Sequence, residues 1–355
     1  MRMRRHAALV GLFTFGVLAG CSDSSGPDTD FDAADAEQIA AEVENVASAV
    51  EAPDDALQSL QLASAALGFG AGFDVAAAIP GEYRIAPAAL WEIGSIGPAA
   101  LIPSNYLGVT FVWDETEQWY VPSDRTGAPA NGVRVVYYAM DPVTEMPVSP
   151  LQELGYVDLA DEGTAESERL GITVVSTSGD SNVTLADYYL DISWEETATS
   201  FTVNASAVGF ISDGTNQLDF DLNQSVSGSE TSGLSLTMDH TLSLPGQDVS
   251  VNFTASGTFD LQTEEMGDLD VTFTIQNGAD TMVLEATVST ANGSETIEGT
   301  IKYNGEVVAN ISGSPENPTF TKPDGTELTQ QEVAALERIF EGISNVFEFV
   351  ENIFV

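Results

Sequence analysis

Side chains that build most catalytic and metal sites are almost absent from this sequence. It contains one cysteine, Cys21, and two histidines, of which His240 is the one outside the N-terminal leader. One cysteine cannot form an intramolecular disulfide, and one histidine cannot supply a multi-histidine metal site. The motifs of a nucleophile elbow, a P-loop, a zincin and an EF-hand loop are missing as well. We therefore predict a protein that is not an enzyme, with no catalytic residue, no metal ligand and no cofactor.

Positive charge is also scarce. The chain has 10 Lys and Arg residues against 55 Asp and Glu residues, a formal net charge of −45. Arg2, Arg4 and Arg5 lie in the leader, so seven basic residues and a net charge of −48 remain without it. Contacts to phosphate need Lys and Arg, which excludes nucleic acid as a partner. Salt screens the self-repulsion of such a surface, so a saline habitat and an ordinary acidic secreted protein both fit.

A long apolar run is missing from the leader. The stretch from Ala7 to Val17 is too short for a stable transmembrane anchor, and it follows the positive residues that begin a signal peptide. Residues 18–21 then read Leu-Ala-Gly-Cys, which resembles the lipobox of bacterial lipoproteins. The resemblance implies cleavage before Cys21, a diacylglycerol on its sulfur and a lipid anchor in the membrane. Ser22 favours the outer membrane where the host has two membranes, and the outer face of the cell membrane is expected otherwise.

Two other interpretations of the leader remain open. One is an ordinary cleaved secretory peptide, and the other is a twin-arginine export signal at Arg4 and Arg5. Each of the three interpretations takes the mature chain out of the cytoplasm.

After the leader, the pattern changes from helical to strand-like along the chain. Ile39, Val43, Val46 and Val50 recur at spacings of four, three and four, which predicts a helix. From residue 107 onward the apolar period becomes two, which predicts strands. The expected segments are a signal peptide (1–20), a lipidated cysteine with an acidic tether (21–32) and one β-rich domain (33–355). Within that domain we expect a helical hairpin (33–67), an apolar Gly/Ala/Pro-rich segment (68–106), a β-meander (107–322) and a C-terminal helix (323–355).

The turns predict which strands pair and in which register. Asn292-Gly293 suits a two-residue turn, which would place Val288 opposite Ile297 and Met282 opposite Tyr303. Two further turns, at 245–248 and 277–280, give registers that also place apolar residues opposite one another. A two-residue turn at Asp213-Gly214 would place Gly209 opposite Leu218. Since a one-residue slip would reverse a strand's faces, successive turns that favour the same face predict an antiparallel meander.

The end of the chain predicts an amphipathic helix. Thr329 and Glu332 have the spacing of a capping box, and apolar residues then recur at three and four from Val333 to Phe354. We expect this helix to pack on the apolar face of the sheet. The predicted fold is thus mainly β, a long antiparallel meander forming a curved sheet, half-barrel or barrel, with the helical hairpin and this helix beside it.

The apolar face needs a cover, because it is larger than soluble proteins leave exposed. A curved sheet with an apolar interior is similar, in outline, to the lipoprotein-carrier half-barrels of the LolA type, although no motif of that family matches here. The resemblance implies a lipid-anchored envelope protein that binds or carries a hydrophobic, lipid-like ligand in that interior. The alternatives are a structural or interaction lipoprotein with a fully packed core, and a hydrolase with an unrecognised carboxylate site.

Candidate ligand-binding residues are the aromatics of the apolar segment and the polar or aromatic side chains on the apolar face. They are Phe69, Phe73, Trp91, Tyr188, Gln224, His240 and Tyr303. The expected partners are the membrane, through lipid on Cys21, and a hydrophobic small molecule or lipid, with no nucleic acid.

Overall fold

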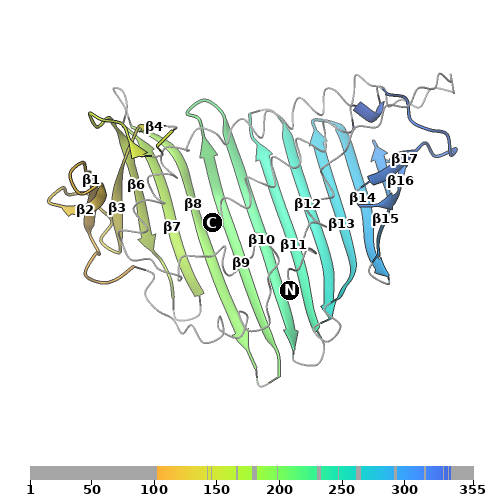
Figure 1. The fold of residues 1–355 in the computed structure, drawn as a ribbon, viewed down its shortest axis with the longest axis horizontal. Coiled ribbons are helices and arrows are strands. Elements are labelled where there is room, and N and C mark those ends of the chain that lie inside the picture. Colours follow the sequence, from red (N-terminus) through yellow and green to blue (C-terminus); the bar gives the residue numbers. More distant parts are fainter. Residues whose placement is uncertain are drawn as a thin grey trace. The chain divides into compact units, whose positions relative to one another are not determined.

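The computed structural model describes residues 102–336, except 142, 145, 165–166, 178–181, 198, 230–232, 247, 261–264, 292–293, 316, 331 and 335. Fifteen strands form one sheet, in the order β17-β16-β15-β14-β13-β12-β11-β10-β9-β8-β7-β6-β3-β1-β2, and β4 pairs with β5 separately (Figure 1). The strands are β1 (Val109–Asp114), β2 (Trp119–Ser123), β3 (Gly132–Tyr138), β4 (Met140–Asp141), β5 (Met146–Pro147), β6 (Glu153–Asp161), β7 (Ser167–Ser176), β8 (Val183–Glu196), β9 (Phe201–Ser212), β10 (Gln217–Ser229), β11 (Gly233–Leu244), β12 (Val249–Asp260), β13 (Glu265–Asn277), β14 (Asp280–Ala291), β15 (Ser294–Tyr303), β16 (Glu306–Ser314) and β17 (Asn317–Thr321). The predicted mainly-β meander is therefore confirmed.

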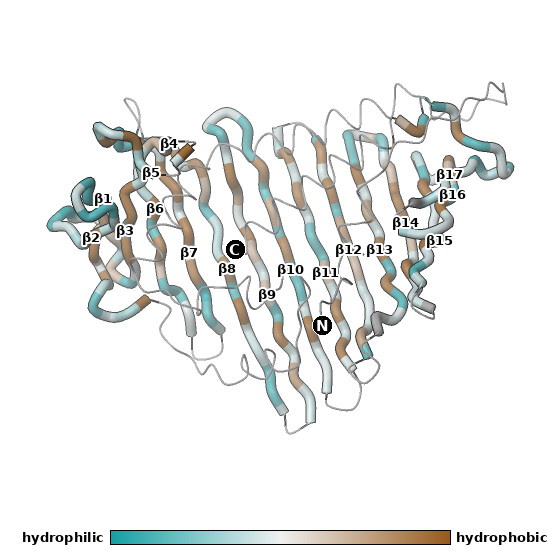
Figure 2. The backbone as a smooth tube through the Cα atoms, viewed as in Figure 1, coloured by the Kyte–Doolittle hydropathy of each residue, from teal (hydrophilic) through white to brown (hydrophobic). Residues whose placement is uncertain are grey.

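The registers predicted from the turns are mostly confirmed. Val288 pairs with Ile297 and Met282 with Tyr303, although the turn at 292–293 lies outside the described residues. The other two turns give the expected pairs as well, for example Leu242 with Val251. Brown and pale or teal segments alternate along the strands in Figure 2, as a sheet with one apolar and one polar face requires.

One predicted turn is longer than expected. The Asp213 amide donates a hydrogen bond to the Asn216 carbonyl at 3.2 Å, so residues 213–216 form a four-residue turn rather than a two-residue one. The Asp213 carboxylate accepts bonds from the Asn216 and Thr215 amides at 2.7 and 2.6 Å, which also lowers its pKa. Because the turn is longer by one residue on each side, each residue of β9 is opposite a residue of β10 two positions further along than predicted. A shift of two residues leaves the same side chains on the apolar face.

Two features of the predicted meander are wrong. β1 pairs with β3 in parallel, as Val109 opposite Val133 shows, so the sheet is mostly rather than wholly antiparallel. A closed barrel is also wrong, because the sheet's order ends at β17 and β2 and no pairing of the described residues joins these strands. Leu107, expected in the first strand, precedes β1 and is 39% exposed.

The helical predictions fall mainly outside the described residues. The hairpin at 33–67 and the apolar segment up to residue 101 lie there, as does the chain after Leu336. The capping box is confirmed: the Thr329 amide donates to Glu332 Oε2 at 2.6 Å, and the Glu332 amide donates to Thr329 Oγ1 at 3.3 Å. A helical turn begins at Gln330, and Leu336 within it is buried. Packing of a longer helix on the sheet remains a prediction.

The chain divides into two compact units, which we describe separately. Of the described residues, the N-terminal unit contains those in 102–195 and 203–221, and the C-terminal unit contains those in 196–202 and 222–336. Each unit has an apolar face, and the side chains of its core are less than one tenth exposed to solvent. In the N-terminal unit these include Val135, Val157, Ile172 and Leu218, and in the C-terminal unit Val251, Phe273, Leu284 and Ile301.

Candidate functional site

The structure places four of the candidate ligand-binding residues. Tyr188, Gln224, His240 and Tyr303 are described, whereas Cys21, Phe69, Phe73 and Trp91 lie outside the described residues. Gln224 and His240 belong to the C-terminal unit and Tyr188 to the N-terminal unit. Tyr303 lies on β15, opposite Met282 on β14. Three strands separate β15 from β11, which carries His240. Of the four, the structure brings Gln224 and His240 together.

Gln224 and His240 form a polar pair in an otherwise apolar face. Their Nε2 atoms are 3.4 Å apart, and the His240 side chain, only 4% exposed, lies beside the Phe253 ring with centroids 5.7 Å apart. An amide nitrogen only donates, so His240 Nε2 accepts in this arrangement and the neutral ring carries its proton on Nδ1. Among the described residues, Nδ1 has no hydrogen-bond partner. The face thus holds a buried donor that a hydrogen-bond acceptor would satisfy.

The imidazole is neutral at physiological pH. Burial lowers the pKa of His240 to about 4, and the neighbouring Asp239 carboxylate only partly opposes this. Asp239 follows the alternation of β11 onto the polar face and is exposed. A neutral donor in an apolar setting suits an uncharged acceptor, such as the carbonyl of an ester, better than a solvated ion.

The apolar face changes in exposure at this pair. On one side of it, Leu222, Leu242 and Val251 are 0–3% exposed. On the other side Leu234 and Ala255 are still buried, but four further inward apolar side chains of the same three strands are only half-buried. We call these residues the apolar end: Val226, Leu236, Met238 and Phe259. The pair therefore stands at the border between a packed interior and partly accessible apolar surface.

Tyr188 occupies a close-packed position in the N-terminal unit. Its ring meets Phe220 edge-on, with centroids 5.5 Å apart, and burial raises the pKa of its phenol above the ordinary value. A Cβ at Gly209 would collide with the Asp187 carbonyl and with Tyr188. This glycine therefore lets β9 approach β8, which makes Tyr188 part of the packing.

Sequence reasoning missed the ion pairs of the N-terminal unit. Arg134 holds Asp158 through two bonds of 2.7 Å, and its guanidinium carbon lies 3.6 Å from the centre of the Tyr156 ring. Arg169 repeats the arrangement with Asp191 at 2.9 Å, over the Tyr189 ring. Both arginines stand directly opposite their carboxylates on neighbouring strands. A bulge at Val174 and Val175 shifts the register of β7 and β8 by one residue, so the hairpin between these strands does not reveal the second pair.

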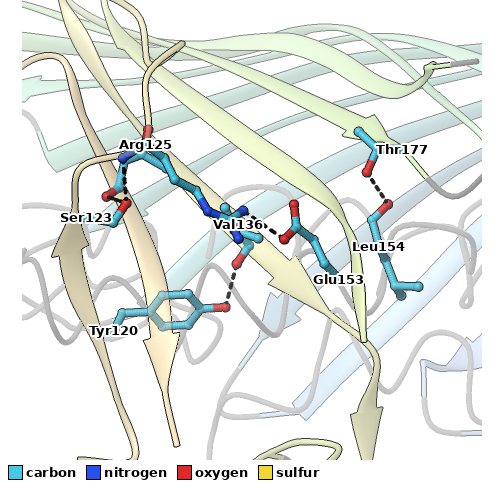
Figure 3. A network of polar contacts seen from close by, with 8 residues as sticks. Tyr120, Ser123, Arg125, Val136, Glu153, Leu154 and Thr177 are labelled. Carbon is cyan, nitrogen blue, oxygen red and sulfur yellow. Dashed lines mark hydrogen bonds and ion pairs between the residues drawn. The ribbon is translucent and has the colours of Figure 1, made fainter. Parts of the chain in front are cut away.

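A third pair closes the edge of the same unit. Arg125 bonds Glu153 at 2.8 Å, and the Tyr120 hydroxyl donates to the Val136 carbonyl at 2.9 Å (Figure 3). These contacts link β6 and β3 to residues at and just beyond the end of β2. They hold the sheet's edge in place and leave no described arginine without a carboxylate.

Other site chemistry has little basis in the described part of the chain. No group of three or more His, Cys, Asp or Glu side chains among those residues could hold a metal ion. Glu168 is the described carboxyl group whose pKa is resolved as raised, first by burial and then by Asp161. In the same part of the chain, we find no helix with the length and hydrophobicity needed to cross a membrane.

The fold and this pair define a class: an open, mostly antiparallel β-meander with a polar pair on its apolar face. Comparison with protein-family models, curated proteins and solved structures finds no match to this chain. The resemblances to lipoproteins and to lipoprotein carriers accordingly remain predictions.

Proposed function

We propose that this protein is a lipid-anchored protein of the cell envelope that binds a hydrophobic ligand at the apolar end of its C-terminal unit. One observation carries the proposal: the buried His240 donor lies beside apolar side chains that are only half-buried. An apolar chain along Val226, Leu236, Met238 and Phe259 would bury this surface, and each buried CH₂ contributes about 0.8 kcal/mol. A carbonyl at the end of that chain would accept the Nδ1 proton. The anchor rests on the sequence signal at Cys21.

Native mass spectrometry tests the ligand. The full chain, purified from its membrane in mild detergent, should carry a defined added mass that organic extraction removes. Leu236→Ser should reduce the bound fraction, because Leu236 faces the ligand. Thr237→Ser is the matched control, since Thr237 is the next residue and faces solvent. Absence of any added mass, or equal loss in both variants, would contradict ligand binding.

The anchor has its own test. Cys21→Ala should abolish labelling by radioactive palmitate and release the chain from the membrane fraction. Ser22→Ala should leave both unchanged. Retention of Cys21→Ala in the membrane would overturn the lipoprotein proposal without bearing on the ligand.

A structural role is the second candidate, and one observation favours it. Away from the apolar end the inward side chains are packed, and among the described residues only Thr110 Oγ1 and His240 Nδ1 are buried side-chain polar atoms without a hydrogen-bond partner. A satisfied, packed interior is what a scaffold protein needs. This candidate predicts no added mass and a melting temperature unchanged by organic extraction.

A further inference from the structure

A hollow lies at the ends of β9, β10, β11 and β12 in the C-terminal unit. Its volume is about 500 Å³, within the range of small-molecule sites. Thr202, Ser227, Ser229, Ser235 and Thr258 are among the residues that line it. Each follows the alternation onto the polar face, as exposed Ser235 beside buried Leu234 illustrates. The hollow therefore lies at the strand ends and takes its hydroxyl groups from the polar face, while Phe201 and Leu234 line it from the apolar face.

Its described lining is uncharged. None of the eleven described residues that line it is Asp, Glu, Lys or Arg, in a chain with 55 acidic residues. Seven of them carry hydroxyl groups, which both donate and accept hydrogen bonds. An anion would be repelled by the carboxylates of this acidic chain, and a cation would find no charged ligand among the described lining residues. These properties fit a neutral ligand with many hydroxyl groups.

The fold positions these hydroxyls without help from a ligand. Ser235 stands directly opposite Thr258 on neighbouring strands. At the rim, Thr197 Oγ1 accepts a bond from the Ser200 amide at 3.0 Å and contacts the Ser200 hydroxyl at 2.8 Å. Gly233 has a φ of +74°, and a Cβ there would collide with the Phe259 carbonyl. The tight packing of β11 against β12 fixes the hollow's floor.

We propose that this hollow binds a neutral carbohydrate. The site is distinct from that of the hydrophobic ligand proposed above, because none of the residues of the apolar end lines it, although Leu234 of its lining is paired with Phe259. The sugar is either free or part of a polysaccharide, because both present the same hydroxyl groups.

Titration calorimetry of the full chain in mild detergent tests the assignment. The probes are maltose, cellobiose, amylose and the anionic disaccharide cellobionate. At least one neutral disaccharide should bind, and cellobionate should bind about tenfold more weakly than cellobiose. Tighter binding of amylose than of maltose would assign the site to a polysaccharide, and equal binding per site to free sugar. Failure of maltose, cellobiose and amylose to bind would overturn the proposal.

Matched substitutions assign the binding to the hollow. Ser235→Ala and Thr258→Val should each weaken binding about fivefold, since each removes a hydrogen bond. Ser243→Ala and Thr254→Val are the controls, because they lie on the same strands and the same face but do not line the hollow. Circular dichroism establishes that each variant is folded. Equal weakening by the controls would overturn the site.

Discussion

On the polar face of the N-terminal unit, arginines stand opposite carboxylates and stack on tyrosines, whereas the corresponding rows of the C-terminal unit are largely serine and threonine. Arg134 faces Asp158 in the first unit. In the second, Ser235 faces Thr258 and Thr254 faces Thr272. The strand period is the same in both units. Alternation thus decides which residues reach solvent, while the chemistry they present there varies independently.

The apolar faces differ less, and their differences are local. Both units pack a glycine against a neighbouring strand, Gly209 in one and Gly299 in the other. Both also bury a polar ring, Tyr188 and His240 respectively. His240 has an unpartnered atom and borders half-buried surface, whereas Tyr188 lies among packed side chains. The apolar faces of the two units therefore differ in how each polar ring is packed and hydrogen-bonded. Four predictions test the comparison of the units.

The largest effect is expected from His240→Leu in the delipidated protein. The folded pKa of about 4 lies below the ordinary 6.5, so the unfolded chain takes up the proton first as the pH falls. The contribution of the neutral His240 to the free energy of unfolding is fully present above pH 6.5. Between pH 6.5 and about pH 4 the free energy of unfolding decreases by about 3 kcal/mol. His240→Leu removes this loss, and it also adds about 1 kcal/mol at pH 7 because an unpartnered donor disappears. Urea unfolding from pH 4 to 8 measures both effects.

Tyr188→Phe is the comparison in the other unit. Burial raises the phenol pKa, so Tyr188 does not titrate in this range. The difference between Tyr188→Phe and the unsubstituted protein should therefore be constant with pH. Parallel pH profiles for His240→Leu and the unsubstituted protein would refute the assignment of the buried neutral imidazole.

The second prediction concerns the close-packed glycines. A Cβ at Gly299 would collide with the Glu285 carbonyl and with Ala286, both on the adjacent strand β14. We expect Gly299→Ala and Gly209→Ala each to lower the free energy of unfolding by about 2 to 3 kcal/mol, because the obstacles are backbone atoms. Thr300→Val, on the other face of β15, should change it by less than about 0.5 kcal/mol. A tolerated Gly299→Ala beside an intolerant Gly209→Ala would show that the C-terminal unit is loosely packed.

The third prediction removes Arg134, one of the arginines of the N-terminal unit. Arg134 and Asp158 are only 19% and 18% exposed, so Arg134→Met leaves a poorly solvated carboxylate. We expect a loss of about 2 kcal/mol, less than for a fully buried pair. Arg134→Lys should recover about half, since an ammonium cannot form the two-bond contact or stack as well on Tyr156. A double-mutant cycle with Asp158→Asn measures the coupling, and a value near zero would contradict this account.

Much of the fold was predictable because hairpin turns lie next to the strands that they join. For β11 with β12, β13 with β14 and β14 with β15 the turns gave the pairs directly, and Leu242 opposite Val251 is one example. The parallel pairing of β1 with β3 was not predictable in this way, because β2 and a further connection separate them in sequence. The four-residue turn at 213–216 was missed because the Asp213 side chain, in addition to the positive φ of Gly214, organises it.

The candidate site was predictable in part for the same reason. Gln224 and His240 each followed from the parity of one strand, and the structure brings them within 3.4 Å. The hydroxyl-lined hollow depends on four strand ends together, and no single turn specifies that arrangement. The Arg134–Asp158 pair depends on the register between β3 and β6, whose connection contains the β4–β5 hairpin. Because that connection is long and irregular, the register between β3 and β6 cannot be predicted from the sequence.

The smallest effect is expected from the ion pair between Lys302 and Glu285, on the polar face of the C-terminal unit. Lys302 bonds Glu285 at 2.6 Å, but the side chains are 30% and 49% exposed, and the two residues are diagonal rather than opposite. Lys302→Met should cost about 0.5 kcal/mol or less, because water solvates each charge when its partner is removed. Added salt should abolish this cost while leaving most of the Arg134→Met cost, since exposed pairs are screened more than partly buried ones. If Lys302→Met and Arg134→Met were equally sensitive to salt, the two units would neutralise their carboxylates in the same way. Their polar faces would then differ in composition alone.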